Sequence, residues 1–315
     1  MDPACRFPYE ANNEGAVFLE KSVEKLRGEE LDTLWANAEL RVLAGCAPCQ
    51  PFSTYSQGKD KSGDGRWNLL LQFGRLVKQS EPDLVTMENV PGLSKQDVFR
   101  KFVNRLRDLG YHVSYQTVYC PDYGVPQQRQ RLVLLASRLG SIELIKPTHP
   151  KGSHRSVRDV IGKLKPIAAG EAAARDSLHQ AASLSPINLK RIRASVPGGT
   201  WRDWDADLVA DCHKKASGRK YSSIYGRMEW DRPAPTLTTQ FYNFGSGRYG
   251  HPEQDRAISF REGALIQGFP KNYSFFEPGS NIGRNDLGRL IGNAVPVQLG
   301  EAIGKSVLKH VRKYS

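Results

Sequence analysis

The chain has 315 residues and a formal net charge of +12, with 45 Lys and Arg against 33 Asp and Glu. This length can bury a full core with room for a large and a smaller domain, and the positive charge favours a polyanionic partner, because each basic group placed on a phosphate releases a counterion. The absence of an apolar leader, of a membrane-length apolar run and of a framework spacing among the five cysteines predicts a soluble cytoplasmic protein rather than a secreted or membrane-spanning one.

The first clear strand is the apolar run 40–44, since residues 1–13 lack the periodicity of a regular element and 17–26 carry only a mild apolar pattern. A loop follows in which Cys49 stands between two prolines, and these hold the chain in a stiff, non-helical path. Loops at the carboxyl ends of strands are where open α/β sheets place their chemistry. Cys49 is therefore a candidate nucleophile, although a single cysteine is more often a small buried apolar residue.

Cys46 and Cys49 also form a C-x-x-C pair of the kind found in thiol–disulfide oxidoreductases. Against this reading, Pro51 stands where the helix of a redox site should begin, and the chain is much longer than a thioredoxin-like unit. A zinc site is disfavoured because only Cys212 and His213 adjoin and no second ligand pair has matching spacing, so we expect no metal. From this loop alone, the nucleophilic and the redox interpretations both stay open.

Helices and strands alternate in the next stretch. Apolar spacing predicts a helix over 69–77, a buried strand over 84–87, a helix over 98–109, an alternating strand over 113–119 and a buried strand over 132–136. Glu88 ends the second strand, so its carboxylate should lie at the same sheet edge as Cys49. Arg129 and Arg131 lead into the last strand and, two residues apart in extended chain, should point to the same side, where they suit anions or carbonyl oxygens.

From residue 137 to about 227 the composition changes to frequent Pro, Gly and Ser with weak apolar periodicity, which indicates a smaller, irregular domain. Basic and aromatic residues are interleaved there, a composition that favours contact with DNA over a bare surface. The basic residues that we select are Lys190, Arg191, Arg193, Arg219 and Lys220. A helix over 262–268 follows, and the closing helix should pack back on the first sheet, making the large domain discontinuous.

Four motifs now stand in order: Pro48-Cys49-Gln50, Glu88-Asn89-Val90, residues 127–131, and the segment 292–296 with the sequence Gly-Asn-Ala-Val-Pro. Together they resemble the DNA (cytosine-5)-methyltransferase family over the whole chain, which disposes of the redox interpretation. The resemblance implies an α/β fold with a Rossmann-like S-adenosylmethionine-dependent methyltransferase sheet and a smaller target-recognition domain. The implied boundaries are 1–137 with a closing helix in 285–315 for the catalytic domain, and 138–284 for the recognition domain.

The resemblance also implies the chemistry. Cys49 would add to carbon 6 of a flipped-out cytosine, while a protonated Glu88 would contact ring nitrogen 3 and the exocyclic amine. Arg131 would hold the O2 oxygen, and Arg129 would lie near the thiol and a phosphate. Gln50 and Ser53 would contact DNA, and the polar loop 53–66 would close over the base.

By the same resemblance, Pro48, Leu69, Asn293 and Val295 would line the pocket for S-adenosylmethionine. The family's first strand and its Gly-rich loop have no counterpart before Cys49, and Ser22 stands where an acid often faces the adenine. A start codon assigned too far downstream, a split enzyme completed by another polypeptide, or a decayed relic would each explain this departure. A missing central strand would expose two apolar strand edges, so we expect poor cofactor binding and aggregation.

The sequence therefore predicts an enzyme that methylates carbon 5 of cytosine in a specific duplex DNA sequence. Expected partners are double-stranded DNA and, as a candidate, a cognate restriction endonuclease, with a cytoplasmic, nucleoid-associated location and no membrane. We expect a monomer unless a second polypeptide supplies the Gly-rich motif. The alternatives are a non-catalytic DNA-binding relic and a tRNA cytosine-5 methyltransferase, against which the long recognition segment argues.

Overall fold

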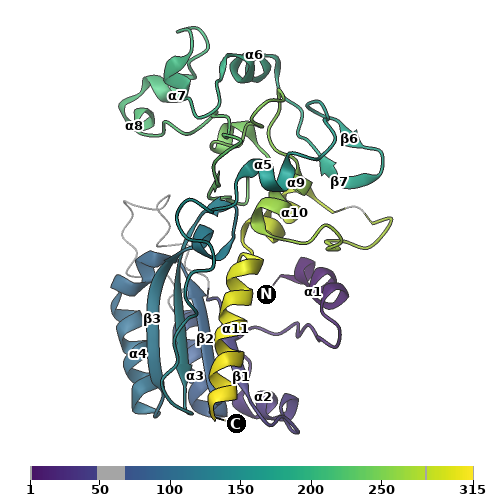
Figure 1. The fold of residues 1–315 in the computed structure, drawn as a ribbon. Helices are drawn as coiled ribbons and strands as arrows, with labels where there is room; N and C mark the ends of the chain where they lie inside the picture. The colour runs from purple at the N-terminus through teal and green to yellow at the C-terminus, as the bar shows by residue number, and fades with distance from the viewer. Residues whose placement is uncertain (1, 48–67, 281, 315) are drawn as a thin grey trace.

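A mixed four-stranded sheet forms the centre of the first half of the chain. The computed structural model describes residues 2–47, 68–280 and 282–314 (Figure 1). The strands are β1 (Val42–Gly45), β2 (Leu84–Asn89), β3 (His112–Tyr119) and β5 (Gln130–Ser137), in the order β1-β2-β5-β3. β1 runs parallel to β2, whereas β5 is antiparallel to both of its neighbours. The α/β architecture expected from the sequence is thus present.

Alternation along the two central strands gives the sheet two apolar faces, because successive side chains of a strand point to opposite sides. On one face, Val85 and Leu134 pack against the helices α3 (Asn68–Ser80) and α4 (Asp97–Asp108). On the other face, Leu84 and Val133 pack against Leu299 of the closing helix α11 (Val297–Tyr314). Figure 1 shows α11 running along the sheet although it is last in the chain, as the sequence predicted.

β1 is an edge strand among the described residues. The one described strand that pairs with β1 is β2. Along β1, exposed and half-buried residues alternate. Val42 keeps 36% of its surface exposed. The outer edge of β1 therefore presents backbone groups that β2 does not pair, and the apolar side chain of Val42 is partly exposed.

A second core lies at the other end of the molecule and is built from short elements joined by irregular chain. Its helices are α5 (Val157–Ile161), α6 (Pro186–Ala194), α7 (Asp211–Lys214), α8 (Ala216–Arg219), α9 (Phe260–Gln267) and α10 (Arg284–Gly292). Residues from α5, α9 and α10 share one apolar cluster with Phe241 and Tyr249. In Figure 1, α6, α7 and α8 form the end of this region farthest from the sheet. The irregular texture predicted from residue 137 is observed, while the domain boundaries stay a prediction.

Short strands and turns complete this architecture. They are β4 (Gln127–Gln128) paired with β8 (Ala234–Pro235), β6 (Ala172–Ala173) paired with β7 (Asp176–Gln180), and the 3-10 turns η5 (Pro91–Lys95), η6 (Cys120–Tyr123), η7 (Trp201–Asp203) and η8 (Phe244–Ser246). The β4–β8 pair joins the sheet half to the second region through parallel strands. None of the described helices is both long and apolar enough to cross a membrane.

The N-terminal residues depart from the expectation that 1–13 holds no regular element. The turn η1 (Pro3–Cys5) and the helix α1 (Arg6–Asn12) lie there, followed later by α2 (Gly28–Leu34). The Asn12 side chain donates to the carbonyl oxygen of Ser274 and accepts from its amide, which holds α1 to a distant loop. Tertiary contacts rather than an apolar stripe stabilise this helix, which is why the sequence pattern did not reveal it.

Candidate active site

Part of the predicted site lies outside the described residues. This part comprises Pro48, Cys49, Gln50, Ser53 and the loop 53–66. Their predicted roles stay predictions, and the described site is the surrounding frame. Asn89 at the end of β2 donates a hydrogen bond of 2.9 Å to the carbonyl oxygen of Ala47. The described end of the cysteine loop is therefore tied to the residue next to Glu88.

Cys46 is not a reactive thiol in this frame. Burial among neighbouring atoms and the nearby Glu88 charge raise the pKa of Cys46 to about 11, although part of the side chain faces solvent. A thiol with such a pKa is almost wholly protonated at neutral pH and is a poor nucleophile. Of the Cys46–Cys49 pair that suggested redox chemistry, Cys46 is therefore poorly reactive, and Cys49 lies outside the described residues.

Glu88 and Arg131 form the centre of the described site. They come from the neighbouring strands β2 and β5, and Glu88 Oε1 lies 2.6 Å from Arg131 Nε. The side chains keep only 10% and 13% of their surface exposed, and Oε1 meets no aligned hydrogen-bond donor among the described residues. Burial raises the pKa of Glu88 and outweighs the opposing effects of Arg131, through its charge and its direct contact, and of the Arg129 charge. This carboxyl group therefore stays protonated to a higher pH than an ordinary glutamate.

Arg129 lies in the break between β4 and β5, not within one continuous strand as the sequence reading assumed. It is 5% exposed, and its Nη1 donates to the carbonyl oxygen of Leu237 at 3.3 Å. Burial and the Arg131 charge lower the pKa of Arg129 to about 10, while Glu88 opposes that change. Both arginines thus act electrostatically on Glu88, and Arg129 Nε is buried without a hydrogen-bond partner among the described residues.

A cavity of about 290 Å³ opens beside the end of β1. Leu69 of the predicted cofactor set lines it, together with Ala47 and apolar residues of α3 and the segment 23–26. A Cβ at Gly45 would lie 2.7 Å from the Phe73 ring, so the close packing of β1 on α3 requires glycine there. Asn293 and Val295 are not among the lining residues; they follow α10, where Asn293 is exposed and Val295 packs against the α11 core.

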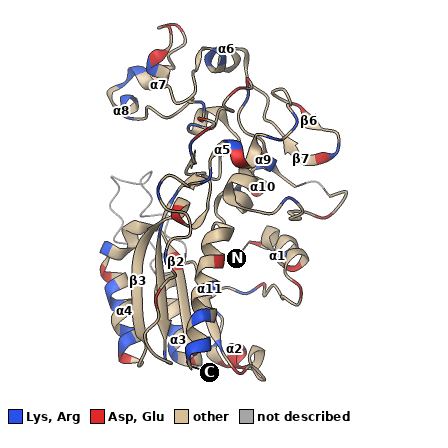
Figure 2. Ribbon diagram, in the orientation of Figure 1, with Lys and Arg blue, Asp and Glu red and all other residues tan. Residues whose placement is uncertain are grey.

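The predicted DNA-binding residues divide into two kinds. Lys190, Arg219 and Lys220 are exposed on or just after α6 and α8. Figure 2 shows Lys and Arg positions along this end of the second region. Arg191 instead turns inward, where its Nε donates to the carbonyl oxygen of Leu208 at 2.8 Å and its guanidinium lies over the Tyr225 ring. Arg193 is exposed and pairs with Asp255 at 3.2 Å. The local contacts of Arg191 are those of a packing residue.

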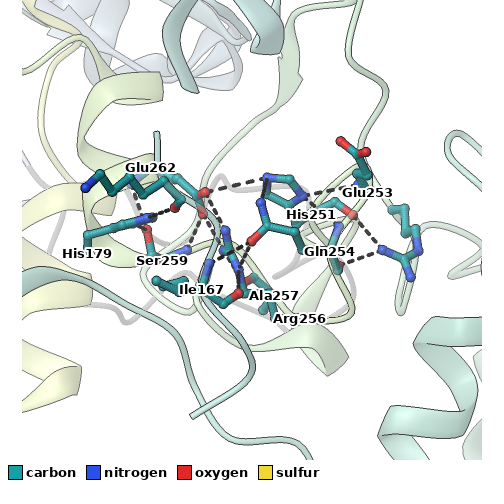
Figure 3. A network of polar contacts seen from close by, with 11 residues as sticks. Ile167, His179, His251, Glu253, Gln254, Arg256, Ala257, Ser259 and Glu262 are labelled. Carbon is teal, nitrogen blue, oxygen red and sulfur yellow. Dashed lines mark hydrogen bonds and ion pairs between the residues drawn. The ribbon is translucent and has the colours of Figure 1, made fainter. Parts of the chain in front are cut away.

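The sequence reading missed a buried polar network in the second region (Figure 3). Arg256 and Glu262 are 0% and 1% exposed and form two parallel hydrogen bonds of 2.7 and 2.8 Å. Glu262 also accepts from the Ser259 amide at 2.7 Å, and His251 Nε2 lies 3.7 Å from Glu262 Oε1. The spacing of Ser259 and Glu262 is a capping box and could have been found in the sequence, whereas nothing in the pattern singled out Arg256.

Comparison with known proteins identifies the family. A family model described as C-5 cytosine-specific DNA methylase matches residues 1–309. The Type II methylase M.HgiDII of Herpetosiphon aurantiacus is 52% identical over 309 residues, which cover 97% of this chain and 86% of that protein. The Type II methyltransferase M.PspPI of Psychrobacter sp. is 32% identical over 288 residues, covering 89% of this chain and 67% of the relative.

A solved structure shares the fold. A putative DNA modification methyltransferase encoded within an E. coli prophage superposes with a TM-score of 0.74 at 20% identity, covering 99% of this chain and 91% of the other. At that identity the similarity speaks for the fold alone. With the family model spanning nearly the whole chain and a relative at 52% identity, the protein belongs to the C-5 cytosine-specific DNA methylase family, as its four sequence motifs predicted.

Proposed function

We propose that this protein transfers a methyl group from S-adenosylmethionine to carbon 5 of cytosine in a specific sequence of duplex DNA. The observation that carries the proposal is the Glu88–Arg131 pair, because an acid with a raised pKa lies against a guanidinium at the sheet edge where the Cys49 loop begins. A cytosine ring under attack needs both a proton donor and a cation at its polar edge.

The residues would act in sequence on a flipped-out base. The Cys49 thiolate forms a bond to carbon 6, and the displaced electron pair makes carbon 5 nucleophilic. Protonated Glu88 donates to ring nitrogen 3 as negative charge develops there, and Arg131 donates to the O2 oxygen. After methylation, loss of the carbon 5 proton to a base returns the electron pair, and the bond between sulfur and carbon 6 breaks. As the Cys49 thiolate leaves, ring nitrogen 3 returns its proton to Glu88, so both side chains are ready for another cycle.

The described residues fit one part of the cofactor. S-adenosylmethionine, when bound, supplies the electrophilic methyl group. The cavity of about 290 Å³ beside β1 has the apolar lining that suits a purine ring, with Leu69 and Ala47 as walls. We infer that this cavity holds the adenine and that Pro48, Asn293 and Val295 contact the remainder of the molecule.

Duplex DNA is the proposed substrate, read by a recognition domain over 138–284. Lys190, Arg219 and Lys220 support this, because exposed cations of the described chain can pair with phosphates. Arg193, Gln50 and Ser53 complete the proposed contacts, and the inward-facing Arg191 would support the domain from within. A cognate restriction endonuclease is a proposed partner, and we expect a cytoplasmic monomer on the nucleoid.

Covalent trapping tests this proposal. The protein is incubated with S-adenosylmethionine and a duplex carrying 5-fluorocytosine in place of cytosine, since fluorine cannot leave as a proton does. A stable adduct in denaturing gels is expected, and Cys49→Ala should abolish it while duplex binding persists. A tRNA transcript with the same base is the matched control. If an adduct forms on tRNA but not on DNA, the substrate is tRNA and the proposal is wrong. If no adduct forms on any duplex although the protein still binds DNA, the protein is non-catalytic.

A further inference from the structure

A chain of buried hydrogen bonds joins the sheet half of the molecule to the segment that precedes α11. Gln127 in β4 and Gln267 at the end of α9 are both 0% exposed. Gln127 Nε2 donates to Gln267 Oε1 at 2.7 Å, and Gln267 Nε2 donates to the carbonyl oxygen of Ala294. Two side chains from distant parts of the sequence therefore connect β4 to the residue between Asn293 and Val295.

The other end of this chain reaches Arg129. Gln127 Oε1 accepts from the Leu237 amide at 2.9 Å and from Arg129 Nη1 at 3.4 Å. Arg129 Nη1 also donates to the carbonyl oxygen of Leu237 at 3.3 Å. The backbone of Leu237 and the side chain of Gln127 together hold the guanidinium that acts on Glu88.

The direction of the chain is fixed by its ends. A backbone amide can only donate and a backbone carbonyl can only accept. The Leu237 amide therefore requires the oxygen of Gln127, and the Ala294 carbonyl requires the nitrogen of Gln267. Turning either side-chain amide around would set donor against donor or acceptor against acceptor in a dry site, at a large cost. One arrangement of both glutamines satisfies every partner.

We propose that Gln127 and Gln267 are positioning residues that hold the segment 293–295 and Arg129 in a fixed relation to one another. This inference rests on the proposed function, in which Asn293 and Val295 contact the cofactor and Arg129 lies beside the reacting thiol. Gln267 acts through Ala294 on the cofactor side. Gln127 acts on both sides, because it touches Arg129 as well as Gln267. Neither glutamine needs to touch substrate or cofactor.

Backbone hydrogen exchange tests the coupling without any ligand. Gln267→Met keeps the volume of the side chain but removes both hydrogen bonds, so amide exchange in 292–296 and in 127–131 should rise roughly tenfold. Exchange in α4, which shares no partner with Gln267, should stay unchanged. Gln116→Met on the exposed surface of β3 is the matched control. Unchanged exchange in 292–296 in a folded Gln267→Met variant would overturn the proposal.

A conservative variant separates positioning from bulk stability. In Gln267→Glu one carboxyl oxygen can still accept from Gln127, but the other can donate to Ala294 only when it is protonated. Protection of 292–296, measured relative to the parent at each pH, should therefore recover as the pH is lowered. A loss of protection that is independent of pH and spread over the whole second region would indicate a structural role only.

Steady-state kinetics supply the last readout. Gln267→Met should raise KM for S-adenosylmethionine roughly tenfold with a smaller change in kcat, and Gln127→Met should lower kcat as well, because it also releases Arg129. An unchanged KM in both variants would overturn the coupling. If the parent protein methylates no duplex, the proposed function fails, but the exchange experiments still decide whether the glutamines position the two segments.

Discussion

Two Arg–Glu pairs in this protein have the same chemistry and opposite behaviour. Glu88 and Arg131 in the sheet half have a contact of 2.6 Å, and burial raises the pKa of Glu88. For Glu262 in the second region burial also acts to raise the pKa, but the hydrogen bonds and charge of Arg256, with His251 and the Ser259 amide, outweigh it and lower the pKa. Glu262 is the more deeply buried of the two carboxyl groups.

The number of aligned donors explains the difference. Glu262 accepts two hydrogen bonds from Arg256 and one from Ser259, so its negative charge is stabilised by direct contacts. Glu88 Oε1 has a cation nearby but no aligned donor among the described residues. A satisfied pair is suited to hold a domain together, whereas an incompletely satisfied acid is suited to give its proton to a substrate.

The largest expected effect comes from breaking the satisfied pair. Glu262→Leu leaves Arg256 fully buried without a counter-charge, and the free energy of unfolding should fall by about 3–5 kcal/mol. Urea unfolding measures this loss. The double variant Arg256→Met/Glu262→Leu should recover much of the stability, because no buried charge remains. A double variant no more stable than the single one would show that packing, not charge, dominates at this site.

Replacement of the other acid should separate activity from stability. Glu88→Gln removes the proton donor and should lower the rate of methyl transfer by roughly 100-fold or more. The raised pKa means that the folded state favours the protonated form of Glu88. The contribution of Glu88 to the free energy of unfolding is therefore fully present below its ordinary pKa of 4.5, and it is lost as the pH rises through the folded-state pKa. A neutral isostere should therefore leave stability at pH 7 unchanged or improved. A loss as large as that of Glu262→Leu would contradict the comparison.

A smaller effect should appear in the pH dependence of the second region. Burial, together with the charges of Arg256 and Arg227, lowers the pKa of His251 to about 4, against the opposing effect of Glu262. Between pH 6.5 and 4, His251 binds a proton in the unfolded chain but stays neutral in the folded chain. The free energy of unfolding therefore falls with falling pH by up to about 1.4 kcal/mol per pH unit. His251→Asn should flatten that slope in urea unfolding at pH 6.5, 5.5 and 4.5. An unchanged slope would show that proton uptake by His251 on unfolding does not set the acid sensitivity in this range.

The sheet half could be predicted from the sequence because its elements follow simple apolar patterns. The predicted strand 84–87 and helix 98–109 correspond to β2 and α4 within two residues at each end. Glu88 and Arg131 could be selected because they directly adjoin buried strands. Glu88 lies near the end of β2 and Arg131 near the start of the antiparallel strand β5, so their positions in the sequence already place both at the same end of the sheet.

The second region resisted prediction because polar contacts between distant segments hold it together. The inward turn of Arg191 depends on the carbonyl of Leu208 and the ring of Tyr225, neither of which any local pattern connects to it. Gln127 and Gln267 are polar residues with no visible periodicity, and only the folded chain shows them to be fully buried partners. Residues near Cys49 lie outside the described part of the chain, so their geometry stays a prediction.

The place of α11 in the chain bears on how the protein matures during translation. β5 ends at Ser137, while the helix that covers the second face of the sheet begins only at Val297. At ribosomal speeds, synthesis of the residues between them takes roughly 10–30 s, during which Leu84 and Val133 lack their helical cover. The nascent sheet therefore passes through a period in which chaperones or premature contacts compete for that face. Slowing translation between residues 137 and 297 should therefore increase aggregation.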